Sequence, residues 1–545
     1  MKTFSLAALS VASLLSLSLN PSSLHAQAPV RRSCAVITAE PTEGETMISS
    51  HRYKDAELLY QAAIAKDASN IEDHLGLVRA YIGEDMVPEA RAASDAMLKK
   101  FPDNSLSLVA QSEMYYRAGN ADEAQRIANK AVMQNPCDAR AHAALANVAE
   151  LRAFYATAAH QLDLAARLSP HDELIHRDWM FYQPRKKRLE ELEKYLTGPN
   201  SLAEDEKASF NNIAEHLKAR HVNECHITST SETAKAAMAP MFGDSRHPIA
   251  YGLDVSLNGK RRRMQIDTGA SGILLTKEAA HSLGLKPEIQ RTVEGVGDEG
   301  SADSYLTHVK TIRIGDVQFE DCMVEVYDDK KSHMSIDGLI GMDVFQNWLV
   351  TLDYPNATLR LAPLPKRPNE ANQDTKLETA NPEASEDTYH PQDAYVNAPE
   401  LKGFIPVARI GHDILLPSTW VDKKNKLSDR DHYLIMDTGA SATNISPAMA
   451  KEIGKLHGSD VEFTGLSGKV KKVWESDYSA MRVANLILPG AEYFVLDNKS
   501  LSHNIGFETD GLFGLPTLQR LTITIDYRDN MVKLNYDPNH DIVRF

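Results

Sequence analysis

The pentapeptide Asp-Thr-Gly-Ala-Ser occurs twice in this chain, at Asp267 to Ser271 and at Asp437 to Ser441. Each copy follows one apolar run and precedes another, which predicts a strand, a tight turn and a second strand. Two unrelated turns that begin with aspartate would give the same two pentapeptides. The surrounding sequence favours a common origin, because it repeats as well.

Three further landmarks follow both copies in the same order: a glycine, an Asp-Gly-Leu-X-Gly segment, and an Asp-Tyr pair that ends a β-rich run. They stand at Gly295, Asp337 to Gly341 and Asp353-Tyr354 in the first half, and at Gly465, Asp510 to Gly514 and Asp526-Tyr527 in the second. Four features in register indicate that the C-terminal half is an internal duplication.

This duplicated pattern, from about Pro248 to Phe545, resembles the aspartic peptidases. The Asp-Thr-Gly-Ala form and the short lobes are more similar to the retropepsin-like branch than to the pepsins. The resemblance implies an all-β bilobal fold with pseudo-two-fold symmetry, in which Asp267 and Asp437 meet. Two neighbouring carboxylates share one proton over a broad pH range. The ionised member can accept a proton from a water that attacks the peptide carbonyl, while the protonated member donates to the carbonyl oxygen. This chemistry needs no metal or other cofactor.

Six residues are predicted to support the two catalytic loops: Thr268, Gly269 and Ser271 in the first, and Thr438, Gly439 and Ser441 in the second. The glycines lack a Cβ, so the loops can approach closely and present backbone N–H groups to the carboxylates. The resemblance implies that the threonines tie the loops together through hydroxyl-to-backbone hydrogen bonds. It also implies that the serines bond the outer carboxylate oxygens. Ordinary turn capping is the alternative for these hydroxyls.

A glycine-rich stretch in each lobe is interpreted as a β-hairpin flap over the active-site cleft, formed by Gly295, Val296 and Gly297 in the first lobe and by Gly465, Leu466 and Ser467 in the second. The first stretch also matches the GxGxxG dinucleotide pattern. It has two acidic side chains where a pyrophosphate would lie, and no convincing helix follows, so we reject that interpretation. Flap glycines would let the hairpins open for substrate and close to exclude water.

The N-terminal residues 1–26 have the features of a secretory signal peptide: a basic start, an apolar run and a small-residue cleavage pattern. The apolar run is short for a membrane span, and no later stretch approaches the ~20 apolar residues that a span needs. We therefore expect an exported protein, periplasmic or secreted, without a transmembrane segment after cleavage. An uncleaved membrane anchor is the alternative.

Residues 53–220 are predicted to form a helical domain. Its sequence repeats with a period of 34 up to about Tyr182, as seen in Ala56, Ala90, Ala124 and Ala158 and again in Pro102, Pro136 and Pro170. Small residues let paired helices pack closely, and a proline near each turn between repeats stops the preceding helix. The period resembles the tetratricopeptide repeat, which implies an all-α solenoid with a concave groove for a peptide or partner protein. A helical spacer without a ligand is the alternative.

The rest of the chain divides into a connector at 221–244, a first peptidase lobe at 245–363, a mobile linker at 364–400 and a second lobe at 401–545. The linker is rich in Pro, Asn and Glu and has few apolar residues. A net charge of −16 argues against a nucleic-acid partner. The four cysteines form no CxxC motif, so metal ligation is not expected. Three disulfide pairings can be drawn, and unpaired thiols are the alternative.

Together these features predict an exported, single-chain aspartic endopeptidase with a helical-repeat domain that binds substrate or a partner. One alternative is a non-catalytic peptide- or protein-binding protein that keeps the peptidase fold. Another is a scaffold for cell-envelope proteins that uses the repeats. Intact motifs in both lobes favour the enzyme, because a protein that only binds has no need of two aspartates that repel each other.

Overall fold

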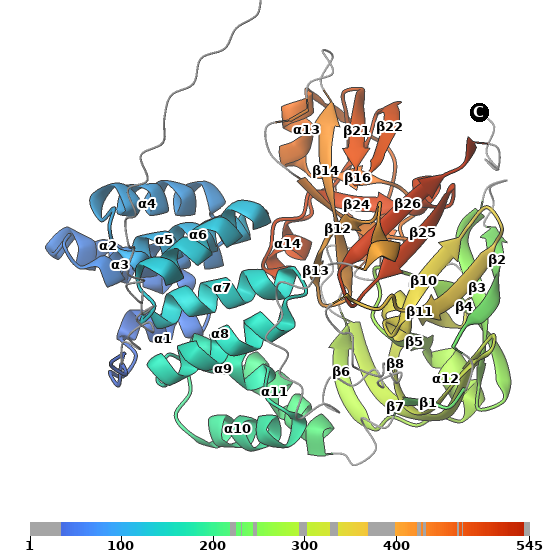
Figure 1. The fold of residues 1–545 in the computed structure, drawn as a ribbon, viewed down its shortest axis with the longest axis horizontal. Helices are drawn as coiled ribbons and strands as arrows, with labels where there is room; N and C mark the ends of the chain where they lie inside the picture. The colour runs from blue at the N-terminus through green and yellow to red at the C-terminus, as the bar shows by residue number, and fades with distance from the viewer. Residues whose placement is uncertain are drawn as a thin grey trace, which may run out of the picture. The chain divides into compact units, whose positions relative to one another are not determined.

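The computed structural model describes residues 34–218, 225–229, 232–242, 248–293, 302–327, 336–368, 398–421, 427–428, 432–465, 468–470 and 472–538 of the 545-residue chain. The chain from Val36 onward forms one compact unit. Helices fill the described part up to Lys218, and strands dominate after it (Figure 1). The predicted signal peptide lies outside the described residues. No described helix is both long and apolar enough to cross a membrane.

The helical domain consists of α1 (Glu43–Ser49), α2 (Tyr53–Lys66), α3 (Ile71–Gly83), α4 (Val87–Lys100), α5 (Ser105–Arg117), α6 (Ala121–Gln134), α7 (Ala139–Leu151), α8 (Tyr155–Leu168), α9 (Glu173–Phe181), α10 (Arg185–Thr197) and α11 (Glu204–Lys218). Helices α3, α5, α7 and α9 each begin after an Asn or Asp whose side chain accepts a hydrogen bond from a backbone N–H of the first turn. The four repeated alanines are completely buried. The 34-residue period therefore sets both the helix starts and the packing of the pairs.

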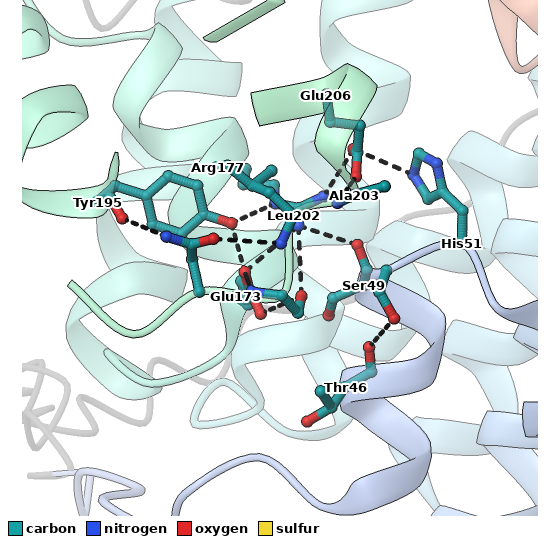
Figure 2. Close-up of polar contacts among 12 residues, drawn as sticks. Thr46, Ser49, His51, Glu173, Arg177, Tyr195, Leu202, Ala203 and Glu206 are labelled. Carbon is teal, nitrogen blue, oxygen red and sulfur yellow. Dashed lines mark hydrogen bonds and ion pairs between the residues drawn. The ribbon is translucent and has the colours of Figure 1, made fainter. Parts of the chain in front are cut away.

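A buried arginine joins the first helix of this domain to its last helices (Figure 2). Arg177 on α9 donates from Nη2 to the backbone oxygen of Ser49 on α1 at 2.9 Å, and from Nε to Tyr195 Oη on α10 at 2.7 Å. Its Nη1 lies 3.3 Å from Glu206 Oε1 on α11. Since an unpaired buried charge is strongly destabilising, these partners hold the two ends of the helical domain together.

The first lobe contains β1 (His226–Ile227), β2 (Ala234–Phe242), β3 (Pro248–Leu257), β4 (Lys260–Ile266), β5 (Ile273–Thr276), α12 (Lys277–Leu283), β6 (Ile289–Val293), β7 (Ala302–Ile314), β8 (Val317–Tyr327), β9 (Gly338–Ile340), η1 (Met342–Phe345), β10 (Trp348–Asp353) and β11 (Thr358–Pro363). Much of the expected connector at 221–244 is in fact β-structure. Strand β2 pairs with both β3 and β11. Its run of alanines and methionines lacks the usual strand composition, so only pairing with distant strands makes it one.

The second lobe contains η3 (Pro399–Leu401), β12 (Ile405–Pro406), β13 (Ala408–Ile410), β14 (Asp413–Val421), β15 (His432–Asp437), β16 (Asn444–Ile445), α13 (Pro447–Ile453), β17 (Leu456–Gly458), β18 (Thr464–Gly465), β19 (Gly468–Lys469), β20 (Trp474–Ser476), β21 (Ser479–Val483), β22 (Leu486–Ala491), β23 (Phe494–Val495), α14 (Lys499–Ile505), β24 (Gly511–Gly514), α15 (Leu515–Leu518), β25 (Leu521–Asp526) and β26 (Met531–Tyr536). Residues 369–397 of the predicted linker lie outside the described part.

The two lobes repeat one topology around their Asp-Thr-Gly-Ala-Ser loops. In the first, β9 runs parallel to β4 and antiparallel to β5, the strands on either side of the loop. In the second, β24 runs parallel to β15 and antiparallel to β16. Strands β9 and β24 come from the two Asp-Gly-Leu-X-Gly segments. These segments therefore thread between the strands that carry each loop and hold the loop's two ends.

A shared sheet joins the lobes. Strand β10 of the first lobe pairs antiparallel with β25 of the second, with Thr351 opposite Thr524, and the strand order runs β12-β26-β25-β10-β11-β2. The hydroxyls of these two threonines are 3.3 Å apart. The Asp of each Asp-Tyr landmark ends one of these two strands, Asp353 in β10 and Asp526 in β25. The duplication is therefore also visible where the two lobes meet.

The cysteines are in disulfide form. Cys225 and Cys322 are bonded to each other across the first lobe, and Cys34 and Cys137 are also disulfide-bonded. No described cysteine is a free thiol. The alternative of unpaired thiols is therefore wrong.

Contacts also link the helical domain to the second lobe. Arg117 at the end of α5 donates from Nη1 to Glu508 Oε2 at 3.1 Å, and the Glu508 N–H donates to the Arg117 carbonyl at 3.0 Å. Leu151 of α7 packs in a buried cluster with Tyr433 and Phe507 of the lobe. The helical domain is therefore packed against the lobe that carries Asp437.

Candidate active site

Four hydrogen bonds cross between the two loops that carry the repeated motif. The Thr268 N–H donates to Thr438 Oγ1 and the Thr438 N–H to Thr268 Oγ1, each at 3.0 Å. The Thr268 hydroxyl donates to the Met436 carbonyl at 2.5 Å, and the Thr438 hydroxyl to the Ile266 carbonyl at 3.2 Å. Both threonines are buried. These reciprocal bonds fix the backbone on either side of Asp267 and Asp437 across the lobe boundary.

The glycines of the two loops allow the aspartates to meet. A methyl group on Gly269 would lie 3.0 Å from Asp437 Cγ, and one on Gly439 would lie 2.5 Å from Asp267 Oδ2. Real Cβ atoms essentially never approach other heavy atoms below 3.0 Å. Each carboxyl group therefore packs against the glycine of the opposite loop, which brings Asp267 and Asp437 together.

The two carboxylates accept different numbers of hydrogen bonds from backbone N–H groups. Asp437 Oδ1 accepts from the N–H groups of Gly439 at 2.8 Å and Ala440 at 2.9 Å. Asp267 Oδ1 accepts from the Gly269 N–H at 2.9 Å. Hydrogen bonds to a carboxylate stabilise its charged form. The geometry therefore favours a pair in which Asp437 is ionised and Asp267 carries the shared proton.

The pKa of both aspartates is raised above the ordinary value. For Asp267 it is raised well above, first because burial disfavours the charged carboxylate and second because Asp437 repels it. For Asp437 burial is again the main cause, and the hydrogen bonds from the Gly439 and Ala440 N–H groups work in the opposite direction. Such a pair binds its first proton readily and its second only in stronger acid.

A third carboxyl group, unforeseen in the sequence, belongs to this site. Asp413 at the start of β14 is buried, and burial raises its pKa to about 6, with a smaller contribution from the charge of Asp437. The neighbouring His412 contacts the first loop, with Nε2 at 3.1 Å from the Gly269 carbonyl oxygen. The pair precedes the second pentapeptide by more than twenty residues and has no repeated counterpart in sequence, so no motif indicated it.

The serines differ from expectation in part. The Ser271 hydroxyl donates to Asp343 Oδ2 at 2.9 Å, and the Gly272 N–H donates to Asp343 Oδ1 at 2.9 Å. Ser271 thus supports its loop through Asp343 of η1, where the resemblance implied a bond to the catalytic carboxylate. Ser441 is exposed at the matching position of the second loop.

The flap predictions fall mostly outside the described residues. Strands β6 and β7 pair antiparallel as far as Val293 and Ala302, and the predicted flap residues Gly295, Val296 and Gly297, which follow Val293 in the sequence, lie outside the described residues. In the second lobe Gly465 pairs with Gly468, while Leu466 and Ser467 between them are not described. Each predicted flap is therefore flanked by paired strands, and contact of its tip with substrate stays a prediction.

In the helical domain, charged side chains pair with one another across several helices. Arg140 at the start of α7 forms ion pairs with Glu45 of α1, Glu72 of α3 and Asp172 just before α9. These bonds, like those of Arg177, connect helices that are distant in sequence. Across the described residues, no group of three or more His, Cys, Asp or Glu side chains is placed to hold a metal ion.

Comparison with protein families finds two matching segments. Residues 253–344, which include the Asp267 loop, match a family model described as aspartyl protease, and residues 47–112 match one described as tetratricopeptide repeat. The chain thus contains one segment similar to tetratricopeptide repeats and, after it, one similar to aspartyl proteases. The predicted resemblances and the predicted order of an all-α part before an all-β part are confirmed. No curated protein was found to match the chain.

Two solved structures are similar to separate parts of the chain. A retropepsin-like aspartic protease from Rickettsia conorii is 24% identical over 25% of this chain and 94% of its own, with a TM-score of 0.19. A thermophilic tetratricopeptide-repeat protein from Thermus thermophilus is 18% identical over 30% of this chain and 90% of its own, with a TM-score of 0.24.

Proposed function

We propose that this protein is an aspartic endopeptidase that hydrolyses peptide bonds with a water activated between Asp267 and Asp437. The observation that supports this most is the pairing of the two loops, in which reciprocal threonine bonds and two glycines press the aspartates together. A fold that only bound peptides would gain nothing from two neighbouring buried carboxyl groups, one of which raises the pKa of the other. The match of residues 253–344 to aspartyl proteases points to the same chemistry.

The hydrogen bonds assign a role to each aspartate. Asp437, stabilised as an anion by two N–H groups, accepts a proton from water as the water attacks the peptide carbonyl. Asp267 donates its proton to the carbonyl oxygen, so the tetrahedral intermediate forms without a free oxyanion. As the intermediate collapses, Asp437 gives its proton to the leaving amine nitrogen, and a hydroxyl of the intermediate gives its proton to Asp267, which restores the singly protonated pair.

Export and partner binding belong to the same proposal. Disulfides persist in oxidising compartments outside the cytoplasm, and the described cysteines are all disulfide-bonded. This supports the signal peptide predicted at residues 1–26 and a periplasmic or secreted protein. Tetratricopeptide repeats are typical of protein interaction, so the helical domain is proposed to recruit substrate or a partner protein.

Substitution of each aspartate by asparagine tests the proposed chemistry. Asp267→Asn and Asp437→Asn should each lower the cleavage of a mixed peptide library by about 100-fold or more, because the pair then lacks its acid or its base. Cleavage is measured by mass spectrometry from about pH 3 to pH 8. Asp316→Asn, in the exposed turn between β7 and β8, is the matched control and should cleave like wild type.

Circular dichroism and thermal unfolding serve to check that both variants fold. Full cleavage by either active-site variant would show that the two carboxyl groups do not form the catalytic pair. A folded wild type that cleaves no peptide, but binds peptides equally well with and without the substitutions, would favour the non-catalytic binding protein.

A further inference from the structure

A tight hairpin in the second lobe carries His412 and Asp413 to the catalytic pair. Strands β13 and β14 pair so that Ile410 lies opposite Asp413, which leaves Gly411 and His412 as the two turn residues. Gly411 has φ 58°, the left-handed conformation that glycine permits at the first central position of such a turn. The turn conformation thus places the side chains of His412 and Asp413.

The hairpin is anchored to the strand that ends at Asp437. Leu415 of β14 pairs with Ile435 of β15, and both side chains lie in one buried cluster together with Ala408 of β13. Ala440 of the second catalytic loop packs against the same cluster. His412 and Asp413 are therefore attached to the loop of Asp437 by packing as well as by strand pairing.

The His412 side chain crosses from the second lobe to the first. Its Nε2 lies 3.1 Å from the carbonyl oxygen of Gly269. A carbonyl oxygen only accepts hydrogen bonds, so Nε2 carries the hydrogen. The N–H of the same Gly269 donates to Asp267 Oδ1. The imidazole therefore holds the residue that positions the Asp267 carboxyl group, and it holds it from the opposite lobe.

Asp413 lies against this imidazole and close to the pair. Its Oδ1 is 3.5 Å from His412 Nε2, and its side chain is only 11% exposed. The charged groups that act on Asp413 are His412 of its own hairpin and Asp437 of the second loop, and Asp413 in turn acts on Asp267 of the first loop. Arg409 of the same hairpin instead bonds Asn530 and contacts Tyr155 of the helical domain.

We propose that His412 is a positioning residue of the catalytic pair, which holds the Asp267 loop in place, and that Asp413 adds a third negative charge, which extends activity to higher pH. This inference rests on the proposed peptidase function. The physical reason for the pH effect is repulsion. An ionised Asp413 makes a doubly ionised pair less favourable, so Asp267 and Asp437 keep their shared proton to a higher pH.

Kinetic variants test the two roles separately. His412→Ala should lower kcat about 10- to 100-fold with little change in KM, because the loop that places the catalytic proton is no longer held. His412→Gln, whose amide nitrogen can still donate to the Gly269 carbonyl, should recover most of the loss. Asp413→Asn keeps the shape and removes the charge, so the alkaline limb of the kcat profile should move about 0.5 to 1 pH unit lower.

A second His-Asp pair in the same lobe is the matched control. His457 Nε2 lies 2.8 Å from Asp477 Oδ1, and both side chains are about half exposed, at 55% and 44%. His457→Ala and Asp477→Asn should leave kcat and both limbs of the pH profile unchanged. If these variants shift the profile as much as Asp413→Asn does, the effect comes from general surface charge and our inference is wrong.

A titration that needs no turnover separates this inference from the peptidase function. The infrared band of protonated carboxyl groups, identified by its loss in Asp267→Asn, should disappear at a lower pH in Asp413→Asn than in wild type. If wild type cleaves no peptide but the band disappears at a lower pH in Asp413→Asn, the peptidase function fails, whereas the proposed effect of Asp413 on Asp267 and Asp437 stands. If wild type is active while neither the band nor the alkaline limb moves, the inference about Asp413 is overturned.

Discussion

Gly439 shows how much of this site depends on an absent side chain. Its Cα position would place a Cβ 2.5 Å from Asp267 Oδ2, whereas the same atom on Gly269 would lie 3.0 Å from Asp437 Cγ. The first distance is impossible without movement and the second is at the limit of what real Cβ atoms show. The close approach of the two carboxyl groups therefore requires that neither residue has a Cβ.

At this scale we predict that Gly439→Ala abolishes hydrolysis while the protein still folds. The methyl group must push Asp267 away from Asp437, so the pair loses its shared proton and activity should fall by about 100-fold or more. Gly458→Ala in the same lobe is the control, because a Cβ there has nothing within 4 Å. Activity and melting temperature are measured for both variants. Wild-type activity in Gly439→Ala would mean that the loops are further apart than described.

Among the elements, the shared sheet differs between its two halves at the duplicated Asp-Tyr landmarks. Asp353 at the end of β10 accepts from Asn356 and Arg360, and these hydrogen bonds lower its pKa against the effect of burial. Asp526 at the end of β25 is completely buried, its Oδ2 has no hydrogen-bond partner among the described residues, and burial raises its pKa to about 6. The pKa of the aspartate is thus lowered in the first lobe and raised in the second, so the two residues are expected to change the stability of the fold with pH in opposite directions.

For Asp526 we predict that stability falls as pH rises. The folded state holds the proton up to about pH 6, whereas the unfolded chain releases it near the ordinary value of 3.8. The free energy of unfolding therefore decreases between these values, and the penalty is complete above pH 6. Asp526→Asn removes this dependence, so its advantage over wild type should grow by up to about 3 kcal/mol from pH 4 to pH 8. Urea unfolding at both pH values measures it.

For the counterpart Asp353→Asn we predict a pH dependence of stability with the opposite sign. The lowered pKa of Asp353 means that its ionised form stabilises the fold above the ordinary pKa, and that this contribution is lost as pH falls. Asp353→Asn should therefore be less stable than wild type at pH 8, with a smaller difference in acid. Equal pH dependence in both variants would contradict the different environments of the two aspartates.

On the scale of the whole molecule, the helical domain and the second lobe share a buried boundary. The side chain of Arg117 is 6% exposed and pairs with Asp85 of the helical domain and with Glu508 of the lobe. Because Arg117 lies between carboxylates of both domains, we expect it to couple the unfolding of the two domains. The boundary also includes Leu151, Tyr433 and Phe507, so apolar packing contributes beside the charges.

We predict that Arg117→Ala uncouples the two domains. Two carboxylates lose their cation in a mostly buried position, which should lower the free energy of unfolding by about 2 kcal/mol or more and split one thermal transition into two. Arg126→Ala is the control, because Arg126 pairs with Glu123 on the exposed surface of α6 and should change stability by less than about 0.5 kcal/mol. Calorimetry distinguishes the outcomes. A single transition with unchanged stability would contradict this coupling.

The sequence by itself determined the repeated parts of this protein. The 34-residue period predicted the helical pairs, and the duplicated loops predicted two β-rich lobes with Asp267 and Asp437 at equivalent places. Such features can be read along the chain, because a repeated motif requires the same local backbone and the same packing wherever it recurs. The threonine bonds between the loops agree with what the family resemblance implied.

Only the tertiary structure decided the contacts that involve no repeated motif. His412 contacts a carbonyl 143 residues away, Ser271 bonds Asp343, β2 becomes a strand through distant partners, and Cys225 meets Cys322. Each of these depends on the register between segments far apart in sequence, which local composition does not encode. The two aspartates of the proposed catalytic pair could be picked out from their motif, whereas the residues that lie next to them depend on how the chain folds.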